Sequence, residues 1–237
     1  VRLIEEEKIE DLTVTKYEQT DIELKVQNKN PSIEAFFKTV SVLQNVELSV
    51  TENKRINIKR AKRAIQSIVD VVLHDEYTAL ALTRVYDMAT FYINHSTNVA
   101  ILAIVLGNRL GLRKKKLGEL GMTALFHDLG MTQVPKEIIT KPGPLTEEEW
   151  TAVQEHPLLG AKLLLRSDRI VDVVVRSMQV GLQHAMRNDL SGYPRLRNEF
   201  PLNLFTKIVS VCDAYDAMTS PRSYRERPYA SAEAIRE

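Results

Sequence analysis

The stretch that decides the fold is Thr123-Ala124-Leu125-Phe126-His127-Asp128-Leu129-Gly130, in which an apolar helical run ends in an adjacent histidine and aspartate. Imidazole nitrogen and carboxylate oxygen suit metals such as Fe, Mn, Zn or Mg. Two neighbouring side chains can reach one site only where the backbone turns, which is easier at the end of a helix than within it. On its own, the dipeptide favours a simpler interpretation, in which His127 complements the helix dipole and Asp128 faces water. The rest of the sequence changes this balance.

Length and composition describe an ordinary globular chain. It has 237 residues, of which 44% are hydrophobic and 27% are charged, enough to bury a core in one large domain or two small ones. A formal net charge of +1 does not indicate wholesale nucleic-acid binding, so neither DNA nor RNA is expected as a partner. The single cysteine, Cys212, excludes an internal disulfide and fits a reducing compartment, so we expect a cytoplasmic location.

The two ends of the chain predict that it is a piece of a longer protein. It begins without methionine and ends within a helix-like run, Ala232–Glu237. The charged N-terminus does not resemble a signal peptide, and no apolar run approaches the length of a membrane span.

The first 75 residues carry little recognisable chemistry. Leu12–Thr15 and Ile22–Val26 alternate apolar and polar residues, as half-buried strands do, and residues 28–32 predict a turn. Helical spacing follows at the apolar positions Phe36, Phe37, Val40 and Leu43. We therefore expect residues 1–75 to form a small α+β or mostly helical module with a regulatory or dimerising role, which would make the protein a homodimer in the second case. His74-Asp75-Glu76 interrupts the apolar pattern and predicts the boundary.

Two histidines fall on the apolar faces of predicted helices. The face that carries His95 has apolar residues at steps of three and four, namely Val85, Met88, Tyr92, Val99, Leu102 and Leu106. His127 shares its face with Leu117, Leu120 and Ala124. A single histidine in a core position is usually hydrogen-bonded to an acceptor, so neither residue alone predicts a ligand.

Three further residues with possible metal-binding side chains lie in or beside predicted apolar helices. His156 comes directly before Pro157, whose ring disturbs the helix ladder and holds the histidine at a fixed angle. His184 follows a strongly apolar helix over Val171–Leu182. Asp213 lies in an apolar helix, where a carboxylate is costly unless it is coordinated or paired with an arginine. A shared metal site explains all of these residues together.

The order of these motifs resembles the HD superfamily of metal-dependent phosphohydrolases, and within it the HD-GYP family, over about residues 78–237. The other matching residues are Ser96, Val134-Pro135, Lys141–Thr146, Asp189, Ser191–Pro194, Ala214–Thr219, Arg222 and Tyr224-Arg225. The resemblance implies a mainly α fold: an HD-type helical bundle over residues 76–237, truncated at its C-terminal end and preceded by the N-terminal module.

Known members of this family hydrolyse cyclic di-GMP, a bacterial second messenger, at two or three metal ions. The resemblance therefore implies divalent metal cofactors, one or two per chain, with Fe or Mn expected first and Mg, Zn or Ni as alternatives. It gives as ligands of the first metal His95, His127, Asp128 and Asp213. A second metal would be bridged by Asp128 and held in part by His156 and His184. Asp128 and His127 are accordingly the expected catalytic residues.

Substrate-binding residues also follow from the resemblance. Arg222 and Arg225 match basic positions placed to clamp phosphate, which arginine can do with two parallel hydrogen bonds, although both also fit ordinary surface charge. Gly192 and Tyr193 belong to the Gly-Tyr-Pro loop, which would lie beside the ligand, cyclic di-GMP or a related cyclic dinucleotide. The same loop is where we expect a diguanylate cyclase-type signalling partner to dock.

The sequence departs from the family pattern at four positions. The family usually has a second histidine after His184, a lysine two residues after Leu129, a glycine before Ser191 and, in trimetal members, a glutamate four residues before His95. Here those positions are Ala185, Met131, Leu190 and Phe91. A lost ligand or phosphate contact can reduce affinity or rate by orders of magnitude.

Three hypotheses for function follow from this mixture of matches and departures. The first is a metal-dependent phosphodiesterase that hydrolyses cyclic di-GMP to pGpG or GMP, weakened by Ala185 and Met131. The second is a catalytically inactive cyclic-dinucleotide sensor or protein-docking module. The third is hydrolysis of another nucleotide, because metal-assisted attack on phosphate esters does not itself select the base.

Overall fold

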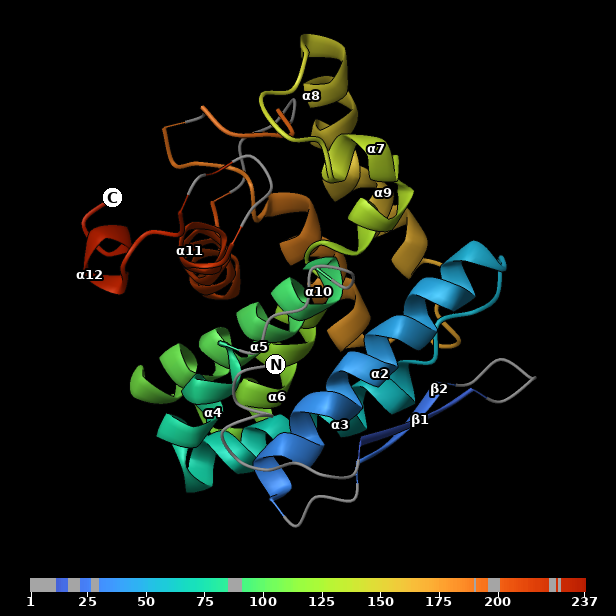
Figure 1. The fold of residues 1–237 in the computed structure, drawn as a ribbon, viewed down its shortest axis with the longest axis vertical. Coiled ribbons are helices and arrows are strands. Elements are labelled where there is room, and N and C mark those ends of the chain that lie inside the picture. The colour runs from blue at the N-terminus through green and yellow to red at the C-terminus, as the bar shows by residue number, and fades with distance from the viewer. Residues whose placement is uncertain are drawn as a thin grey trace.

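The computed structural model describes residues 12–16, 22–26, 30–84, 91–189, 191–195, 201–221, 225 and 227–237. These residues form a mainly helical molecule, in which a two-stranded hairpin precedes a bundle of helices (Figure 1). This arrangement confirms the predicted fold class, a helical bundle with a small N-terminal module.

The N-terminal strands pair as an antiparallel hairpin. β1 (Leu12–Lys16) and β2 (Ile22–Val26) lie where the alternating pattern predicts strands, with Val14 opposite Leu24. β2 packs against α2 (Pro31–Thr51), which leads into the helical bundle (Figure 1).

The prediction of a turn over residues 28–32 is wrong from residue 31 onward, because α2 begins there. Asn30 caps the helix: its side-chain oxygen accepts a hydrogen bond from the Ser32 N–H at 3.0 Å. Pro31 occupies the first helical position, where a missing N–H removes no helical hydrogen bond. The same Asn-Pro-Ser sequence that is typical of a turn is thus also typical of a helix start.

Four helices form the middle of the bundle. They are α3 (Ile58–His74), α4 (Glu76–Leu82), α5 (Phe91–Arg109) and α6 (Lys114–Leu125). Asp75 follows the end of α3 and caps α4, since its carboxylate accepts hydrogen bonds from the N–H groups of Tyr77 and Thr78, both at 3.1 Å. The helix predicted around His95 is confirmed as α5, whereas two residues of the predicted face, Val85 and Met88, lie outside the described residues.

The second half of the chain adds shorter helices. They are η2 (Leu129–Gln133), α7 (Lys136–Ile139), α8 (Glu147–Gln154), α9 (His156–Leu164), α10 (Asp172–Gln183), α11 (Leu204–Thr219) and α12 (Ser231–Ala234). α8 starts with a capping box, in which the Thr146 hydroxyl accepts a hydrogen bond from the Glu149 N–H and the Glu149 carboxylate accepts one from the Thr146 N–H. The break expected at Pro157 is confirmed, because α8 ends before this residue and α9 begins at His156.

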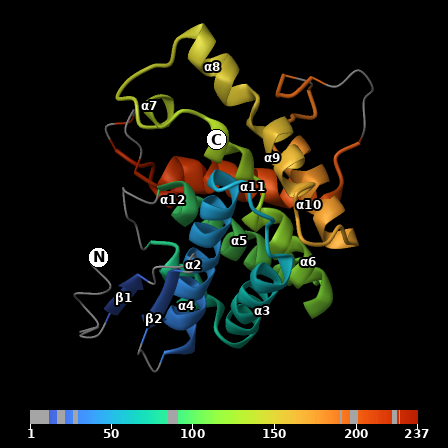
Figure 2. The ribbon, with the colours of Figure 1, turned by 90° about the vertical axis from the view of Figure 1, so that its right-hand side faces the viewer.

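Apolar side chains from both halves of the chain share one core. Phe36 and Leu43 of α2, Ile65 of α3, Leu120 of α6 and Val209 of α11 belong to a single hydrophobic cluster and are almost completely buried. Figure 2 shows α11 lying across the bundle that contains α2, α5 and α6. The core is thus continuous across residue 75, and the predicted division there stays a prediction. Among the described helices, none combines the length and apolar character that a membrane span requires.

A short backbone connection joins the N-terminal module to the second half of the bundle. Ile56 forms an isolated parallel bridge with Ser167, and its carbonyl accepts a hydrogen bond from the Asp168 N–H at 2.9 Å. The Asp168 carboxylate accepts a further hydrogen bond from the Ile58 N–H, at the start of α3, at 3.2 Å. The loop between α2 and α3 is thereby held against the connection between α9 and α10.

Candidate metal centre

His95 projects from α5 into the bundle and is only 4% exposed. Its Nδ1 lies 2.7 Å from a carboxylate oxygen of Asp216, whose other oxygen accepts a hydrogen bond from Asn98 Nδ2 at 3.1 Å. This contact fixes the ring and directs Nε2 to the opposite side, where it lies 3.0 Å from Asp213 Oδ1. A carboxylate behind a histidine is the arrangement that orients imidazole ligands in many metal sites.

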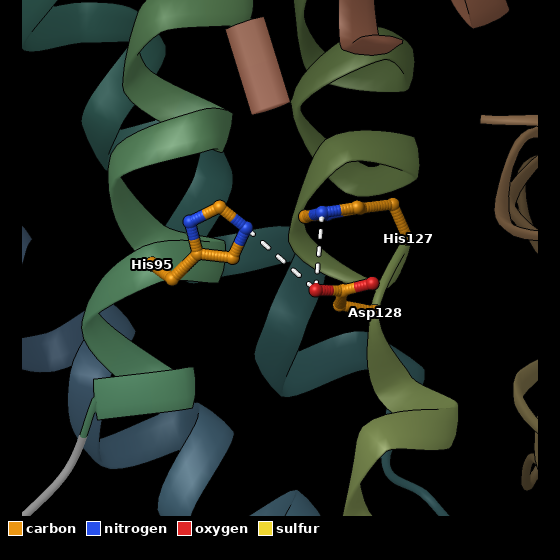
Figure 3. A group of neighbouring side chains, drawn as sticks. All are labelled: His95, His127 and Asp128. Atoms are coloured by element: carbon orange, nitrogen blue, oxygen red, sulfur yellow. Dashed lines mark ion pairs between the residues drawn. The ribbon is translucent and has the colours of Figure 1, made fainter. Parts of the chain in front are cut away.

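The adjacent residues His127 and Asp128 reach the same space because α6 ends just before them. The helix stops at Leu125. Phe126 (φ −105°, ψ 3°) and Asp128 (φ −102°, ψ 15°) no longer have the backbone angles of an α-helix. Figure 3 shows the His95 and His127 imidazoles directed at one oxygen of Asp128. That oxygen, Oδ2, is 3.6 Å from Nε2 of each ring. The predicted splaying of neighbouring side chains at a helix end is confirmed.

The His127 ring is fully buried and has one nitrogen without a partner. Nδ1 lies 2.7 Å from the Ala124 carbonyl oxygen, to which it can donate a hydrogen bond. Nε2 has no hydrogen-bond partner among the described residues, since the nearest carboxylate oxygens, on Asp128 and Asp213, are 3.6 Å and 3.8 Å away. A buried polar atom left unpaired costs roughly 1–3 kcal/mol, so this nitrogen is placed for a ligand.

A second pair of histidines faces the other oxygen of Asp128. His156 and His184 direct their Nδ1 atoms to the carbonyl oxygens of Val153 and Gly181, at 2.7 Å and 2.8 Å. Their Nε2 atoms are 3.2 Å apart and lie 3.1 Å and 3.3 Å from Asp128 Oδ1. The two oxygens of one carboxylate thus address different pairs of imidazoles, a geometry that suits a carboxylate bridging two cations.

Close backbone contacts hold these elements together. A β-carbon at Gly130 would lie 1.9 Å from the carbonyl oxygen of His156 and 2.6 Å from the backbone nitrogen of Gly160. A β-carbon at Gly192 would lie 2.2 Å from the Ala185 carbonyl oxygen. Only glycine permits such approaches, so the turn after the His-Asp pair lies directly on the first turn of α9.

The Gly-Tyr-Pro loop covers one side of the centre. The Tyr193 N–H donates a hydrogen bond to the Ala185 carbonyl at 3.1 Å, and the Tyr193 ring meets the His156 ring edge-on at 5.9 Å. The cavity beneath this loop is partly open to solvent and has a volume of about 220 Å³. Its lining includes Tyr92, Met131, Ile139, Val153, Ala185 and Tyr193, besides five of the histidine and aspartate residues, His95, Asp128, His156, His184 and Asp213.

Burial and charge act in opposite directions on the titrating groups of this centre. Burial disfavours protonated His95, but hydrogen bonds to Asp213 and Asp216, and the charges of both, outweigh burial and raise the pKa of His95 to about 10. Burial also disfavours ionised Asp213, yet the nearby imidazoles of His127 and His95, the latter within hydrogen-bond distance, lower the pKa of this carboxyl. At Asp128 burial is likewise outweighed by the imidazoles, with His127 first, and its pKa falls well below its usual range. Two ionised carboxylates in a largely enclosed site favour a cation beside them.

The donor set fits a divalent cation. Three sets of residues each bring their ligand atoms within 4.8 Å of one another. They are His95 with His127 and Asp128, His127 with His184 and Asp213, and Asp128 with His156 and His184. Nitrogen and oxygen ligands without thiolate suit metals such as Fe, Mn or Zn. The residues present thus fit the divalent metal that the sequence predicts, while the identity and number of ions stay predictions.

The structure brings together all six residues expected as ligands. Asp213 contacts the imidazoles of His95 and His127, and no ion pair joins it to a described arginine, the alternative that the sequence left open. Arg225 lies apart from the lining of this cavity: its Nη1 donates hydrogen bonds to the carbonyls of Ala217 and Met218, and its guanidinium lies 4.9 Å from the Tyr229 ring centre. Its role in phosphate binding stays a prediction. Arg222, Leu190 and the side chain of Phe91 lie outside the described residues.

Sequence reasoning did not single out Asp216 as a site residue. Its signal was present, because Asp216 follows Asp213 by three residues and so shares a face of the same apolar helix. What the sequence does not show is its partner, which is 121 residues away in the chain.

The fold and the donor set define the class of protein: a helical bundle with an interior cluster of histidines and aspartates that fits a divalent metal. A family model described as HD domain matches residues 82–237. The chain therefore belongs to the HD domain family, and the resemblance drawn from the sequence is confirmed at the level of this family.

Individual proteins agree with this assignment. A cyclic di-GMP phosphodiesterase of Pseudomonas aeruginosa is 35% identical over 181 residues, which cover 76% of this chain and 43% of the relative. A 3′3′-cGAMP-specific phosphodiesterase of Vibrio cholerae is 33% identical over 148 residues, covering 62% of this chain and 33% of the relative. The chain thus spans less than half the length of these curated relatives. An HDG"Y"P protein from Bdellovibrio bacteriovorus has the same fold, with a TM-score of 0.70, 20% identity, and coverage of 90% of this chain and 67% of that one.

We expect Gly130→Ala to damage both the fold and the metal centre. The added β-carbon would meet backbone atoms of His156 and Gly160, which cannot move aside by side-chain rotation. The turn after Asp128 must then shift from α9, so the free energy of unfolding should fall by roughly 2 kcal/mol or more. Affinity for a divalent ion should fall with it. Chemical denaturation and metal titration of the purified protein measure the two effects.

Gly118→Ala is the matched control for this substitution. A β-carbon there meets only the flexible end of Gln66, at 3.8 Å, and alanine within a helix is more stable than glycine by roughly 0.5–1 kcal/mol. Equal stability and equal metal affinity in the two variants would contradict the described packing.

Proposed function

We propose that this chain is the catalytic part of a metal-dependent phosphodiesterase that hydrolyses cyclic dinucleotides, cyclic di-GMP first among them, to pGpG and GMP in bacterial second-messenger signalling. The observation that carries the proposal is the convergence of four imidazole Nε2 atoms on the carboxylates of Asp128 and Asp213. The names of the relatives support the substrate class, since they specify cyclic di-GMP or 3′3′-cGAMP.

Within the proposed centre, the residues divide into two ligand sets. The first consists of His95, His127, Asp128 and Asp213. The second consists of Asp128, His156 and His184. Divalent ions bound by these sets, Fe or Mn in our proposal, supply water of lowered pKa and neutralise charge on phosphoryl oxygens. The protein holds the ligands rigidly, since the Nδ1 atom of each imidazole is already engaged.

The proposed reaction adds one water molecule across a phosphodiester bond. The water oxygen bonds to phosphorus, the bond from phosphorus to a ribose 3′-oxygen breaks, and a proton passes to that oxygen. The cavity of about 220 Å³ is smaller than the roughly 300–1,000 Å³ of sites that enclose a drug-sized ligand. It therefore has room for a phosphodiester and its nearest atoms, while the rest of a cyclic dinucleotide must extend beyond the rim.

A second candidate function is a cyclic-dinucleotide sensor that binds without cleavage. Ala185 and Met131 favour it, because both line the cavity at positions where the family has a second-metal histidine and a phosphate-binding lysine. Tight binding measured by calorimetry, without turnover, would distinguish this function from hydrolysis. Docking of a cyclase-type partner at the Gly192-Tyr193 loop, formation of a homodimer, and clamping of phosphate by Arg222 and Arg225 stay predictions.

The direct test is hydrolysis by the metal-loaded protein. With Mn, Fe, Mg, Zn or Ni we expect the linear dinucleotide to form from cyclic di-GMP in at least one case, and chelation to remove activity together with the metal. His127→Ala should lower the rate roughly 100-fold or more, because it removes a ligand and leaves a buried gap. Chromatography of the products and elemental analysis of metal atoms per chain are the measurements.

His74→Ala is the control, because this histidine is exposed at the end of α3 and belongs to no ligand group. It should match the unsubstituted protein in rate and metal content. Absence of product with every one of these metals would refute the enzymatic proposal.

We expect Asp216, whose carboxylate contacts His95 Nδ1, to affect metal affinity without being a ligand itself. His95 Nδ1 and Asn98 Nδ2 contact different oxygens of Asp216, and in Asp216→Asn one of these oxygens becomes an NH2 group, so one of the two donors loses its acceptor. We expect metal affinity to fall about 10- to 100-fold in a folded protein. Metal titration measures it, and Asp172→Asn, an exposed aspartate of α10, is the control. Unchanged metal affinity in Asp216→Asn would show that Asp216 does not position His95 for metal binding.

Restoring the missing ligand should strengthen the second ligand set. We expect Ala185→His to raise metal content, and Ala185→His with Met131→Lys to speed hydrolysis further, because an imidazole and a cation return to the cavity wall. Ala185→Gln is a control of similar size without an imidazole. If neither metal content nor rate changes while the variants stay folded, the missing-ligand explanation is wrong.

A further inference from the structure

Trp150 is an exposed aromatic residue beside the candidate metal centre. It lies in α8 and is 45% exposed, although a tryptophan usually contributes its large surface to a core or an interface. The start of α8 is stabilised by the Thr146 capping box and by Lys141, whose Nζ donates to the Glu149 carboxylate at 2.6 Å. The ring is therefore presented to solvent on a helix whose first turn is well defined.

A row of aromatic rings connects Trp150 to the metal ligands. Its ring meets that of Tyr193 at 5.7 Å with an interplanar angle of 83°, and the Tyr193 ring meets that of His156 at 5.9 Å and 85°. Tyr193 lines the cavity, and His156 is in the second ligand set. Figure 1 shows α8 at the same end of the molecule as α9. The Trp150 ring therefore lies just outside the cavity, in contact with Tyr193 of its wall.

The size of the cavity indicates what this ring can meet. About 220 Å³ accommodates a phosphodiester but not a whole cyclic dinucleotide, so a base of the bound ligand must lie outside. Glu147 and Glu148, which precede Trp150 in the first turn of α8, are acidic. Their negative charge disfavours a phosphate group beside Trp150 but not an uncharged base. Aromatic side chains are the usual platforms for bases that are not paired, because every base has a π-face.

We propose that Trp150 is a stacking platform for the purine base that a cyclic dinucleotide leaves outside the cavity while its phosphodiester occupies the metal centre. This inference rests on the proposed function. It adds a binding residue to the site and assigns α8 a part in substrate recognition. Stacking does not select among purines, so cyclic di-GMP and 3′3′-cGAMP should both use it.

The chain allows a direct test, because Trp150 is its only tryptophan. When cyclic di-GMP is mixed with the metal-loaded protein, tryptophan fluorescence should be quenched during the first turnover, with a concentration dependence that matches binding by calorimetry. Dimethyl phosphate, which has no base, should not quench it. Binding without any change in the fluorescence would overturn the inference.

Substitutions give a second readout. Trp150→Leu should raise KM for cyclic di-GMP about 5- to 150-fold, the usual effect of losing one stacked base, and change kcat little. Trp150→Phe should keep most of the affinity. Leu165→Ala, which removes another exposed apolar side chain at the end of α9, should leave KM unchanged. An unchanged KM in Trp150→Leu would also overturn the inference.

These measurements separate the two proposals. Quenching without product would refute hydrolysis and support Trp150 as part of a binding site. Product without quenching would support hydrolysis and refute the platform. Absence of both binding and product would refute both.

Discussion

One shared carboxylate determines the geometry of the centre. Asp128 presents Oδ2 to a first pair of imidazoles, His95 and His127, at 3.6 Å each. It presents Oδ1 to a second pair, His156 and His184, at 3.1 Å and 3.3 Å. The first pair comes from α5 and the end of α6, and the second from α9 and the end of α10. Four helices must therefore be positioned correctly at once, and an error of about 1 Å between the two pairs would leave a loosely formed site.

Helix ends supply three of the four imidazoles, for a common reason. The last carbonyls of a helix have no partner within it, and an imidazole just beyond the end can donate its Nδ1–H to one of them. His127, His156 and His184 each follow a helix by one or two residues and contact the carbonyl three residues earlier. This local contact leaves Nε2 directed away from the helix. His95 is the exception, since it lies within α5 and depends on the distant carboxylate of Asp216.

This difference explains how much the sequence could predict. Helical spacing places His95 and His127 on apolar faces, Pro157 marks a break beside a histidine, and the order of motifs gives the family. The fold class and the gathering of these histidines and aspartates could therefore be predicted. Periodicity shows that a face is buried but not what covers it. The shared core of the N-terminal helices, the contact of Asp216 and the position of Trp150 beside Tyr193 therefore required the structure.

The two sides of the proposed centre are unequal, and this inequality bears on function. The first pair of imidazoles lies within ion-pair distance of Asp213 as well as of Asp128. Among the described residues the second pair lies within that distance of Asp128 alone, although His184 also has Asp213 within 4.8 Å, and Ala185 offers no donor. A cation beside the second pair would have one carboxylate in close reach and a cation beside the first pair two, so it would gain less from their negative charge. We therefore expect the second position to bind a cation more weakly. A single ion suffices to attract phosphate, whereas two ions can also stabilise the attacking and the leaving oxygen. Under the proposed function, occupancy of this second position would therefore separate an enzyme from a sensor.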